Sequence, residues 1–307
     1  MSRPLSSFEV SRTVRGRGTG AGPRRSPSTR PGTRVSYPLT AIVSDLHGNE
    51  PALETAIADA RARGARRVVC LGDVIGYGAS PRHNLRLIMR LAVATPDPRE
   101  DLLPWKLLPG LCLQGNHEYA LLNSAEDFNP KARAAIEWTR EELNRGDDKE
   151  QSYAFWDFLA ELRPSADDGT AMFAHGSPRD PVREYMLPRD IADDAKIRAV
   201  FGCMTQPVCF VGHSHVPAVY YEDRRLYQPK GTEGPYDLGD TPSVRVLINV
   251  GSVGQPRDGD HRLSYVLFDG RHVTFVRLEY DHAAAAEAIR AVPELPDHLA
   301  ERLYVGR

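Results

Sequence analysis

The chain has 307 residues, of which 41% are hydrophobic, and a formal net charge of −2 at pH 7. This length and apolar content suffice for one large folded domain with a sizeable core. No apolar run approaches the ~20 residues of a membrane span, and the arginine-rich start lacks the apolar region of a secretory signal. The four cysteines form no CxxC pair, which favours buried free thiols over a metal site or disulfides. We therefore expect a cytoplasmic protein that does not associate with membranes.

The charge is distributed unevenly. Residues 1–37 contain eight arginines and one acidic residue, Glu9, a charge of +7, so residues 38–307 carry −9. The first segment is rich in Arg, Ser, Pro and Gly and has few apolar side chains to bury, so we expect residues 1–37 to be a disordered tail and residues 38–307 to be a single domain. An acidic domain argues against nucleic-acid binding by the domain itself, whereas the basic tail could bind nucleic acid. These features leave the oligomeric state open.

Strands and helices alternate in the first half of the predicted domain. Runs of apolar and β-branched residues predict strands at residues 39–44, 67–71 and 111–114. Helices are predicted at residues 49–63, 81–90, 130–144 and 150–162. Asn49 can cap the first of these helices, and Gly64 can end it. The alternation implies a parallel sheet.

The second half is predicted to be mostly β. Strands are expected at residues 170–174, 208–211, 216–221, 244–249, 263–268 and 272–278. One helix is expected near residues 189–200, and helical segments close the chain at residues 281–303. A second sheet that faces the first, with helices outside both, is the natural packing of these elements.

Five short blocks along the domain contain the residue types that bind metal ions. They are Asp45-Leu46-His47-Gly48-Asn49, Gly72-Asp73, Gly115-Asn116-His117-Glu118, His175, and Gly212-His213-Ser214-His215. Four of the five follow runs of apolar, β-branched or small residues typical of buried strands, and the carboxyl ends of strands are where open α/β sheets bind ligands. Imidazole, carboxylate and carbonyl ligands suit Mn, Fe, Zn, Ni or Co. Two divalent ions ~3.5–4 Å apart need a bridging anion, a role that Asp73 can fill, so the blocks predict a two-metal hydrolase site.

The order and content of these blocks resemble the calcineurin-like metallophosphoesterase superfamily, from about residue 39 to about residue 279. The resemblance implies an α/β fold, a four-layer α/β/β/α sandwich in which two facing mixed sheets are flanked by helices. It also implies two divalent metal ions as cofactors. The first ion would be bound by Asp45, His47, Asp73 and His215, and the second by Asp73, Asn116, His175 and His213. His117 matches the family's catalytic histidine, which lies near the leaving group and binds no metal.

The resemblance implies hydrolysis of phosphate esters by attack of a metal-bridging hydroxide, with His117 protonating or stabilising the leaving oxygen. The segments 72–78, 175–181 and 249–257 look like those of small prokaryotic phosphoesterases, which often act on phosphodiesters. We therefore expect a metal-dependent enzyme, with manganese among its metals, that hydrolyses small phosphodiesters and, as a second class, monoesters. Asn249 and Arg257 are candidate substrate-binding residues, the alternative being a glycine-rich turn with one solvated arginine.

Two other classes of function stay open. Serine/threonine protein phosphatases and dinucleoside polyphosphate hydrolases of the superfamily carry an arginine soon after the Gly-Asp block, and the protein phosphatases carry another before Gly-Asn-His-Glu. Here Gly76-Tyr77-Gly78 and Gln114 occupy those places. A non-enzymatic scaffold subunit would have lost metal ligands, whereas all seven ligand positions are present. Substrate choice is expected to depend on two loops, residues 95–110 and 222–243.

Overall fold

The computed structural model describes residues 37–93, 107–239 and 244–307. In these ranges no helix has the length and apolar character needed to cross a membrane. The predicted tail lies outside them except for Tyr37, whose ring packs edge-on against Phe268 at 5.3 Å between centroids. The Tyr37 hydroxyl also donates a 2.6 Å hydrogen bond to Asp168. The packed domain therefore includes Tyr37, one residue before its predicted start.

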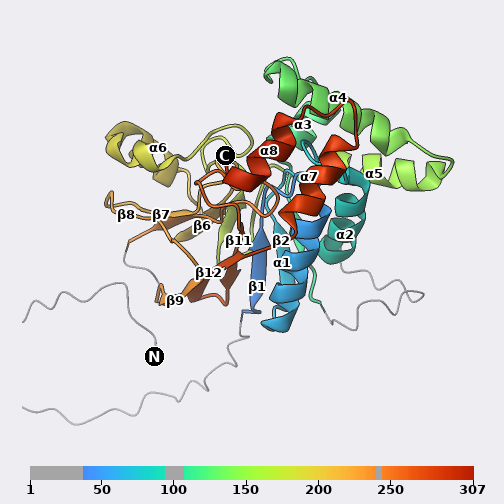
Figure 1. The fold of residues 1–307 in the computed structure, drawn as a ribbon. Coiled ribbons are helices and arrows are strands. Elements are labelled where there is room, and N and C mark those ends of the chain that lie inside the picture. The colour runs from blue at the N-terminus through green and yellow to red at the C-terminus, as the bar shows by residue number, and fades with distance from the viewer. Residues whose placement is uncertain (1–36, 94–106, 240–243) are drawn as a thin grey trace, which may run out of the picture.

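Two mixed sheets of six strands each form the centre of the described molecule (Figure 1). The first has the order β3-β2-β1-β11-β12-β9, with bounds Leu111–Cys112, Arg67–Cys70, Thr40–Val43, Leu263–Phe268, His272–Leu278 and Glu233–Asp237. The second has the order β4-β5-β6-β10-β7-β8, with bounds Ser165–Asp167, Met172–Ala174, Val208–Val211, Val246–Asn249, Ala218–Tyr221 and Leu226–Tyr227. Strands β1, β2 and β3 are parallel, as are β5, β6 and β10, whereas the other pairings are antiparallel.

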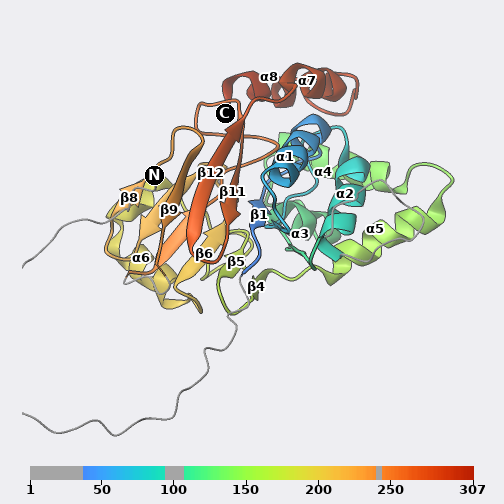
Figure 2. The ribbon, with the colours of Figure 1, turned by 90° about the horizontal axis from the view of Figure 1, so that it is seen from below.

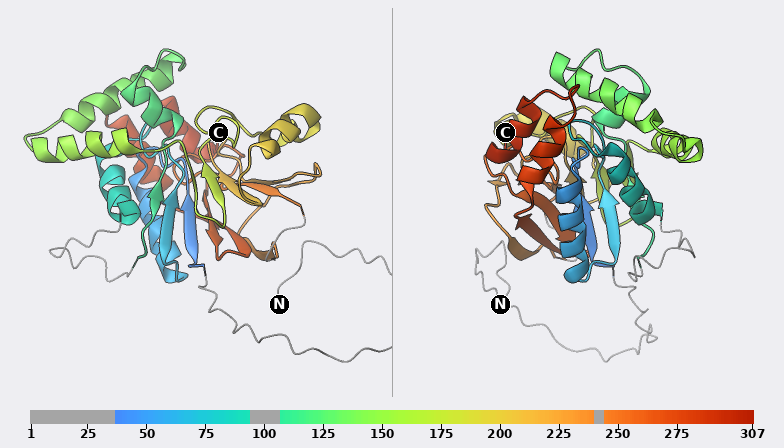
Figure 3. Two further views of the ribbon diagram at one scale, coloured as in Figure 1. Left: turned by 180° about the vertical axis from the view of Figure 1, so that it is seen from behind. Right: turned by 45° about the vertical axis from the view of Figure 1, so that its right-hand side comes forward.

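Helices cover the outer face of each sheet. On the side of the first sheet lie α1 (Glu50–Ala62), α2 (Pro81–Val93), α4 (Pro130–Asn144), α5 (Lys149–Glu161), α7 (His282–Arg290) and α8 (His298–Val305). The second sheet is covered by α6 (Asp194–Gly202) and the short 3₁₀ helix η1 (Pro188–Ala192). Figures 2 and 3 show α6 and the pair α4 and α5 on opposite sides of the strands. The predicted four-layer sandwich is thus confirmed.

An apolar core joins the two sheets. Phe210 of β6 stacks on Phe173 of β5 at 5.9 Å and meets Phe268 of β11, in the other sheet, at 5.1 Å. Further buried residues of this layer are Ile42, Val69, Leu71, Leu113, Val208, Val219, Val246, Ile248, Val266, Val273 and Phe275. Because β-branched and aromatic side chains fill a pleated surface well, the same residues that favour strands also pack the two sheets against each other. This packing fixes the strand ends that carry the site.

The elements agree with the sequence prediction except at short or polar segments. Strands β4, β8 and β9 and helix α3 (Asn116–Leu122) were not predicted. Since β8 and β9 lie within residues 222–243, the expectation of a loop there is wrong. Of the predicted loop 95–110, residues 95–106 lie outside the described ranges. Among the cysteines, Cys70, Cys112 and Cys209 are buried as expected, but Cys203 is exposed.

Candidate metal centre

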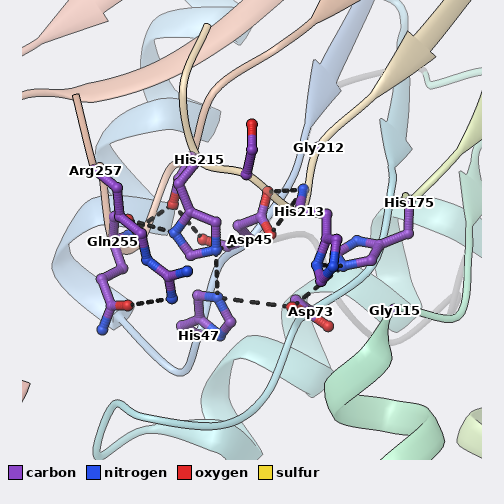
Figure 4. A network of polar contacts seen from close by, with 12 residues as sticks. Asp45, His47, Asp73, Gly115, His175, Gly212, His213, His215, Gln255 and Arg257 are labelled. Atoms are coloured by element: carbon purple, nitrogen blue, oxygen red, sulfur yellow. Dashed lines mark hydrogen bonds and ion pairs between the residues drawn. The ribbon is translucent and has the colours of Figure 1, made fainter. Parts of the chain in front are cut away.

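All five sequence blocks meet at one edge of the sheets, beyond the carboxyl ends of the parallel strands (Figure 4). Asp45 follows β1, Asp73 follows β2, and Asn116 begins α3 after β3. From the second sheet, His175 follows β5 and His213 follows β6. Within each sheet the parallel strands end on the same side, so blocks that are far apart in the sequence are brought together.

The backbone at these blocks adopts a conformation that side chains normally avoid. Five predicted ligands have positive φ angles, between 48° and 63°: Asp45, His47, Asp73, His213 and His215. Among the non-glycine residues described, only Tyr77 and Arg224 share this feature. Each such residue costs about 1–3 kcal/mol, and such strain concentrates at functional sites. The fold therefore gives up stability to aim these side chains inward.

Two glycines make room for the carboxylates. A Cβ atom on Gly115 would lie 2.2 Å from Oδ1 of Asp73. One on Gly212 would lie 2.0 Å from Oγ of Ser44 and 2.7 Å from Oδ2 of Asp45. Any larger residue would displace these atoms, so the close approach of the backbone before these ligand positions favours glycine.

The first ligand group contains two imidazoles whose inner nitrogens face one another. Nε2 of His47 lies 3.2 Å from Nε2 of His215, which in turn lies 3.1 Å from Oδ1 of Asp45. Each outer nitrogen, Nδ1, faces a backbone carbonyl, of Ile75 for His47 and of Gln255 for His215. A carbonyl only accepts hydrogen bonds, so the neutral rings carry hydrogen on Nδ1 and a lone pair on Nε2. Two lone pairs and a carboxylate then converge without a donor between them, which is the environment of a cation.

The second ligand group repeats this arrangement. Nε2 of His175 lies 3.1 Å from Nδ1 of His213, 3.0 Å from Oδ1 of Asn116 and 3.3 Å from Oδ2 of Asp73. The outer nitrogens of both rings again face backbone carbonyls, at 3.2 Å for His175 and 3.1 Å for His213. Such hydrogen bonds orient imidazole ligands in metal sites.

Asp73 connects the two groups. Its Oδ2 lies 3.3 Å from Nε2 of His175 and 3.8 Å from Nε2 of His47, one residue from each group. Its Oδ1 accepts a 2.9 Å hydrogen bond from the backbone N–H of His117. The whole set consists of acceptor atoms, carboxylate, imidazole and amide oxygen, so the residues present fit divalent cations.

The electrostatics of the cluster also favour bound positive charge. Burial acts to raise the pKa of Asp45 and of Asp73, but the neighbouring imidazoles outweigh it and hold both pKa values below the usual range. Burial acts to lower the pKa of His175, yet Asp73 raises it to about 9. Burial lowers the pKa of His213 to about 3. The carboxylates therefore draw in a compensating charge, which a proton on His175 or a bound cation can supply.

His117 lies beside the cluster and outside both ligand groups. Its ring is enclosed by Tyr77, Phe128 and His47, with centroid distances of 4.5, 5.1 and 4.7 Å. Nε2 lies 4.0 Å from Oδ2 of Asp73, and Nδ1 is buried with no hydrogen-bond partner among the described residues. Burial lowers the pKa of His117 to about 4, so the ring is neutral at pH 7.

The two predicted substrate-binding residues lie in different surroundings. Asn249 is fully buried and donates to the carbonyl of Gly212 and to Oγ of Ser214, and its Oδ1 accepts from the N–H of Gly251. These hydrogen bonds favour a structural role for Asn249, in stabilising the turn, rather than the predicted role in substrate binding. Arg257 donates to Oε1 of Gln255, and its guanidinium lies beside the rings of the first ligand group (Figure 4). Substrate binding by Arg257 stays a prediction.

Three residues of the site were not assigned a role from the sequence. The Glu118 carboxylate accepts hydrogen bonds from four backbone N–H groups, those of residues 73, 74, 75 and 115. Arg302 of α8 lies 5.9 Å from the ring of Tyr77, and its pKa is lowered to about 10 by burial and by Arg257. Tyr185 stacks on His213 at 3.7 Å. Only Glu118, inside the Gly-Asn-His-Glu block, had a sequence motif that could have revealed it.

We compared the sequence and the fold of this chain with those of known proteins. The family model of the calcineurin-like phosphoesterase superfamily domain matches residues 39–272. An uncharacterized protein of Methanocaldococcus jannaschii is 35% identical over 275 residues, which cover 88% of this chain and 98% of the relative. The crystal structure of a metallophosphoesterase from Sphaerobacter thermophilus is similar with 34% identity and a TM-score of 0.69, covering 88% of this chain and all of that one. A hypothetical protein from Pyrococcus horikoshii OT3 shares the fold with 19% identity and a TM-score of 0.63, over 88% of this chain and 98% of its own.

Proposed function

Because the chain belongs to the calcineurin-like phosphoesterase superfamily, we propose that it is a binuclear metal-dependent hydrolase of small phosphodiesters, with monoesters as a second class of substrate. The observation that supports this proposal best is the arrangement of four imidazole lone pairs in two groups. His47 and His215 form one pair, His175 and His213 form the other, and Asp73 lies between them.

Two divalent ions held by these groups would supply Lewis acidity, which neutralises phosphate charge and makes an attacking water more acidic. The protein's own contribution begins with orientation. The backbone carbonyls behind the four imidazoles keep their inner nitrogens unprotonated and fix the ring planes. The strained turns at Asp45 and Asp73 hold the two carboxylates rigidly, so little reorganisation is needed when an anionic substrate enters.

We assign to His117 the role of acting on the leaving oxygen. A neutral imidazole can donate a hydrogen bond, and the negative charge of a bound phosphate raises the pKa of a neighbouring histidine, so proton donation becomes easier in the complex. The enclosure by Tyr77 and Phe128 keeps water away from the ring. In this proposal His117 would supply a proton to the leaving oxygen as it develops negative charge.

The preference for diesters follows from charge and from space. A monoester carries two negative charges, and the two positions that carry arginines in protein phosphatases hold Gly76-Tyr77-Gly78 and Gln114 here. The guanidiniums of Arg257 and Arg302 lie 5.8 and 5.9 Å from the centroid of the Tyr77 ring, and they donate hydrogen bonds to Oε1 of Gln255 and to the carbonyl of Arg307. A cavity beside Asn116 and His213 offers room for a second ester group. These features suit a singly charged phosphate with two organic substituents.

The test compares substrates that share one leaving group. With metal-loaded protein, kcat/KM for bis(p-nitrophenyl) phosphate should equal or exceed that for p-nitrophenyl phosphate. Asp73→Asn serves as the control for contaminating phosphatases, because it removes the residue shared by both ligand groups and should remove both activities. A strong preference for phosphoserine or phosphothreonine peptides, or for dinucleoside polyphosphates, would contradict the proposal.

A further inference from the structure

A cavity of about 270 Å³ opens directly beside the candidate metal centre. Asn116 and His213, two members of the second ligand group, form part of its wall. Its volume is slightly below the ~300–1,000 Å³ typical of sites for drug-sized molecules. The space therefore suits one compact organic group that is attached to a phosphate at the metal centre.

Aromatic rings form much of the remaining wall, which includes Tyr77, Tyr119, Phe128 and Tyr185. Tyr185 is 43% exposed, and its ring stacks on that of His213 with an interplanar angle of 23°. The guanidinium of Arg183 lies 4.7 Å from the ring centroid of Tyr119. Flat rings and guanidinium planes are the surfaces on which planar aromatic ligands stack.

The rim of the cavity adds hydrogen-bonding groups of both kinds. The Asp127 carboxylate is an acceptor, its side chain is 85% exposed, and it lies 3.9 Å from Nη1 of Arg183. Asn129 uses its Oδ1 to cap α4, which leaves the N–H donors of its amide for a ligand. Ser124 adds a hydroxyl. A nucleobase presents donors and acceptors along its edge that can bind these groups, whereas a phenyl or aliphatic group has none.

We propose that the cavity lined by Tyr77, Tyr119, Phe128 and Tyr185 binds a nucleobase, so that the phosphate esters placed at the metal centre are those of nucleotides. This inference rests on the proposed function, since it names the substrate class of the same site. The base stacks between the aromatic walls, its edge meets the polar rim, and its phosphate extends toward Asn116 and His213.

Binding is measured by calorimetry on the metal-loaded full chain, with phosphonates in which a CH₂ group replaces the ester oxygen and prevents hydrolysis. The ligands are the nucleoside 5′-phosphonates, ribose 5-phosphonate without a base, and benzyl phosphonate. The best nucleoside ligand should bind about 10–100-fold more tightly than the ligand without a base, the range expected for one stacked base. Equal affinities would overturn the proposal, and so would benzyl phosphonate binding as tightly as the best nucleoside ligand, which would assign the cavity to a phenyl group.

The variant Tyr119→Leu removes one stacking ring and keeps apolar bulk. It should reduce the ratio of the affinity for the best nucleoside ligand to the affinity for ribose 5-phosphonate about 5–10-fold. The control is Tyr153→Leu, at a 66% exposed tyrosine on α5 outside the cavity, which should leave this ratio unchanged. A thermal melt checks folding, and Tyr185→Leu replaces Tyr119→Leu if the latter does not fold. An unchanged ratio in the folded variant would overturn the assignment. Because no turnover is measured, a protein that prefers nucleoside ligands but hydrolyses no diester would refute the proposed function and support the cavity assignment.

Discussion

Replacing Glu118 with glutamine tests how the metal-binding turns are held in place. Oε1 of Glu118 accepts hydrogen bonds from the backbone N–H groups of Val74 and Ile75, at 2.8 and 3.3 Å. Oε2 accepts from those of Asp73 and Gly115, both at 2.8 Å. The side chain is fully buried. Burial and Asp73 raise the pKa of Glu118 to about 7, but the four donors can all be satisfied only by two acceptor oxygens, that is, by the ionised carboxylate.

Glutamine has nearly the same shape but only one oxygen. Whichever way the amide turns, two N–H groups lose their acceptor and face an NH₂ group. A buried unsatisfied donor costs about 1–3 kcal/mol, so Glu118→Gln should lower the free energy of unfolding by about 2–6 kcal/mol, out of the ~5–15 kcal/mol of a typical domain. The affected turns carry Asp73 and Asn116, so metal affinity should fall ~10–100-fold as well.

Guanidinium chloride unfolding should be measured on metal-free protein, because bound metal would add stability by mass action and mask the loss. Metal affinity is then measured by titration. Glu137→Gln, an exposed position on α4, is the matched control. If Glu118→Gln stays within about 0.5 kcal/mol of the wild type, the range of an ordinary surface substitution, and keeps its metal affinity, the positioning role is refuted.

Two further predictions concern the leaving group and the packing of Tyr37. His117→Asn should lower kcat ~10²–10⁴-fold while metal content stays the same, with a smaller loss for p-nitrophenyl than for alkyl leaving groups; equal losses would reject proton donation. For Asp168, burial acts to raise the pKa, but hydrogen bonds from Arg67 (2.5 Å) and Tyr37 outweigh it and lower the pKa. The contribution of ionised Asp168 to the free energy of unfolding is therefore present above the usual carboxyl pKa. It is lost as the pH falls through the lowered pKa of the folded state. Asp168→Asn should cost ~1–3 kcal/mol at pH 7 in urea unfolding, and a loss that is equally large at pH 3 would contradict this reasoning.

Strands with continuous apolar runs were predictable from the sequence, whereas three of the four edge strands, β4, β8 and β9, were not. Residues 208–211, 263–268 and 272–278 are strands with the predicted bounds. By contrast, β9 has the sequence Glu-Gly-Pro-Tyr-Asp, and a Gly-Pro pair argues against a strand. It forms because β12 offers an unpaired edge, where Pro235 is tolerated. Such strands depend on the partner's position, which no local pattern contains.

The features of the site also fall into those that the sequence predicts and those that depend on the fold. The sequence motifs predicted which residues form the two ligand groups, and the fold brings all of these residues together. The left-handed turns at Asp45 and Asp73 could not be predicted, because the backbone there is held by residues distant in the sequence: Asp45 N–H donates to the carbonyl of Gly72, and Asp73 N–H donates to Glu118. Arg302 lies on the last helix and reaches the site only because α8 packs over it. The burial of Asn249 likewise depends on the turn at Gly212, which the sequence does not show.

We propose that two divalent ions bind between these residues and are required for turnover. The most direct test is to remove metal by chelation, verify its loss by elemental analysis, and then add Mn²⁺, Ni²⁺ or Co²⁺ while following both stoichiometry and phosphodiester hydrolysis. We predict no hydrolysis in the metal-free protein and full recovery as the second ion binds, because the attacking water is activated only by the ions. Undiminished hydrolysis by protein shown to be free of metal would contradict the account.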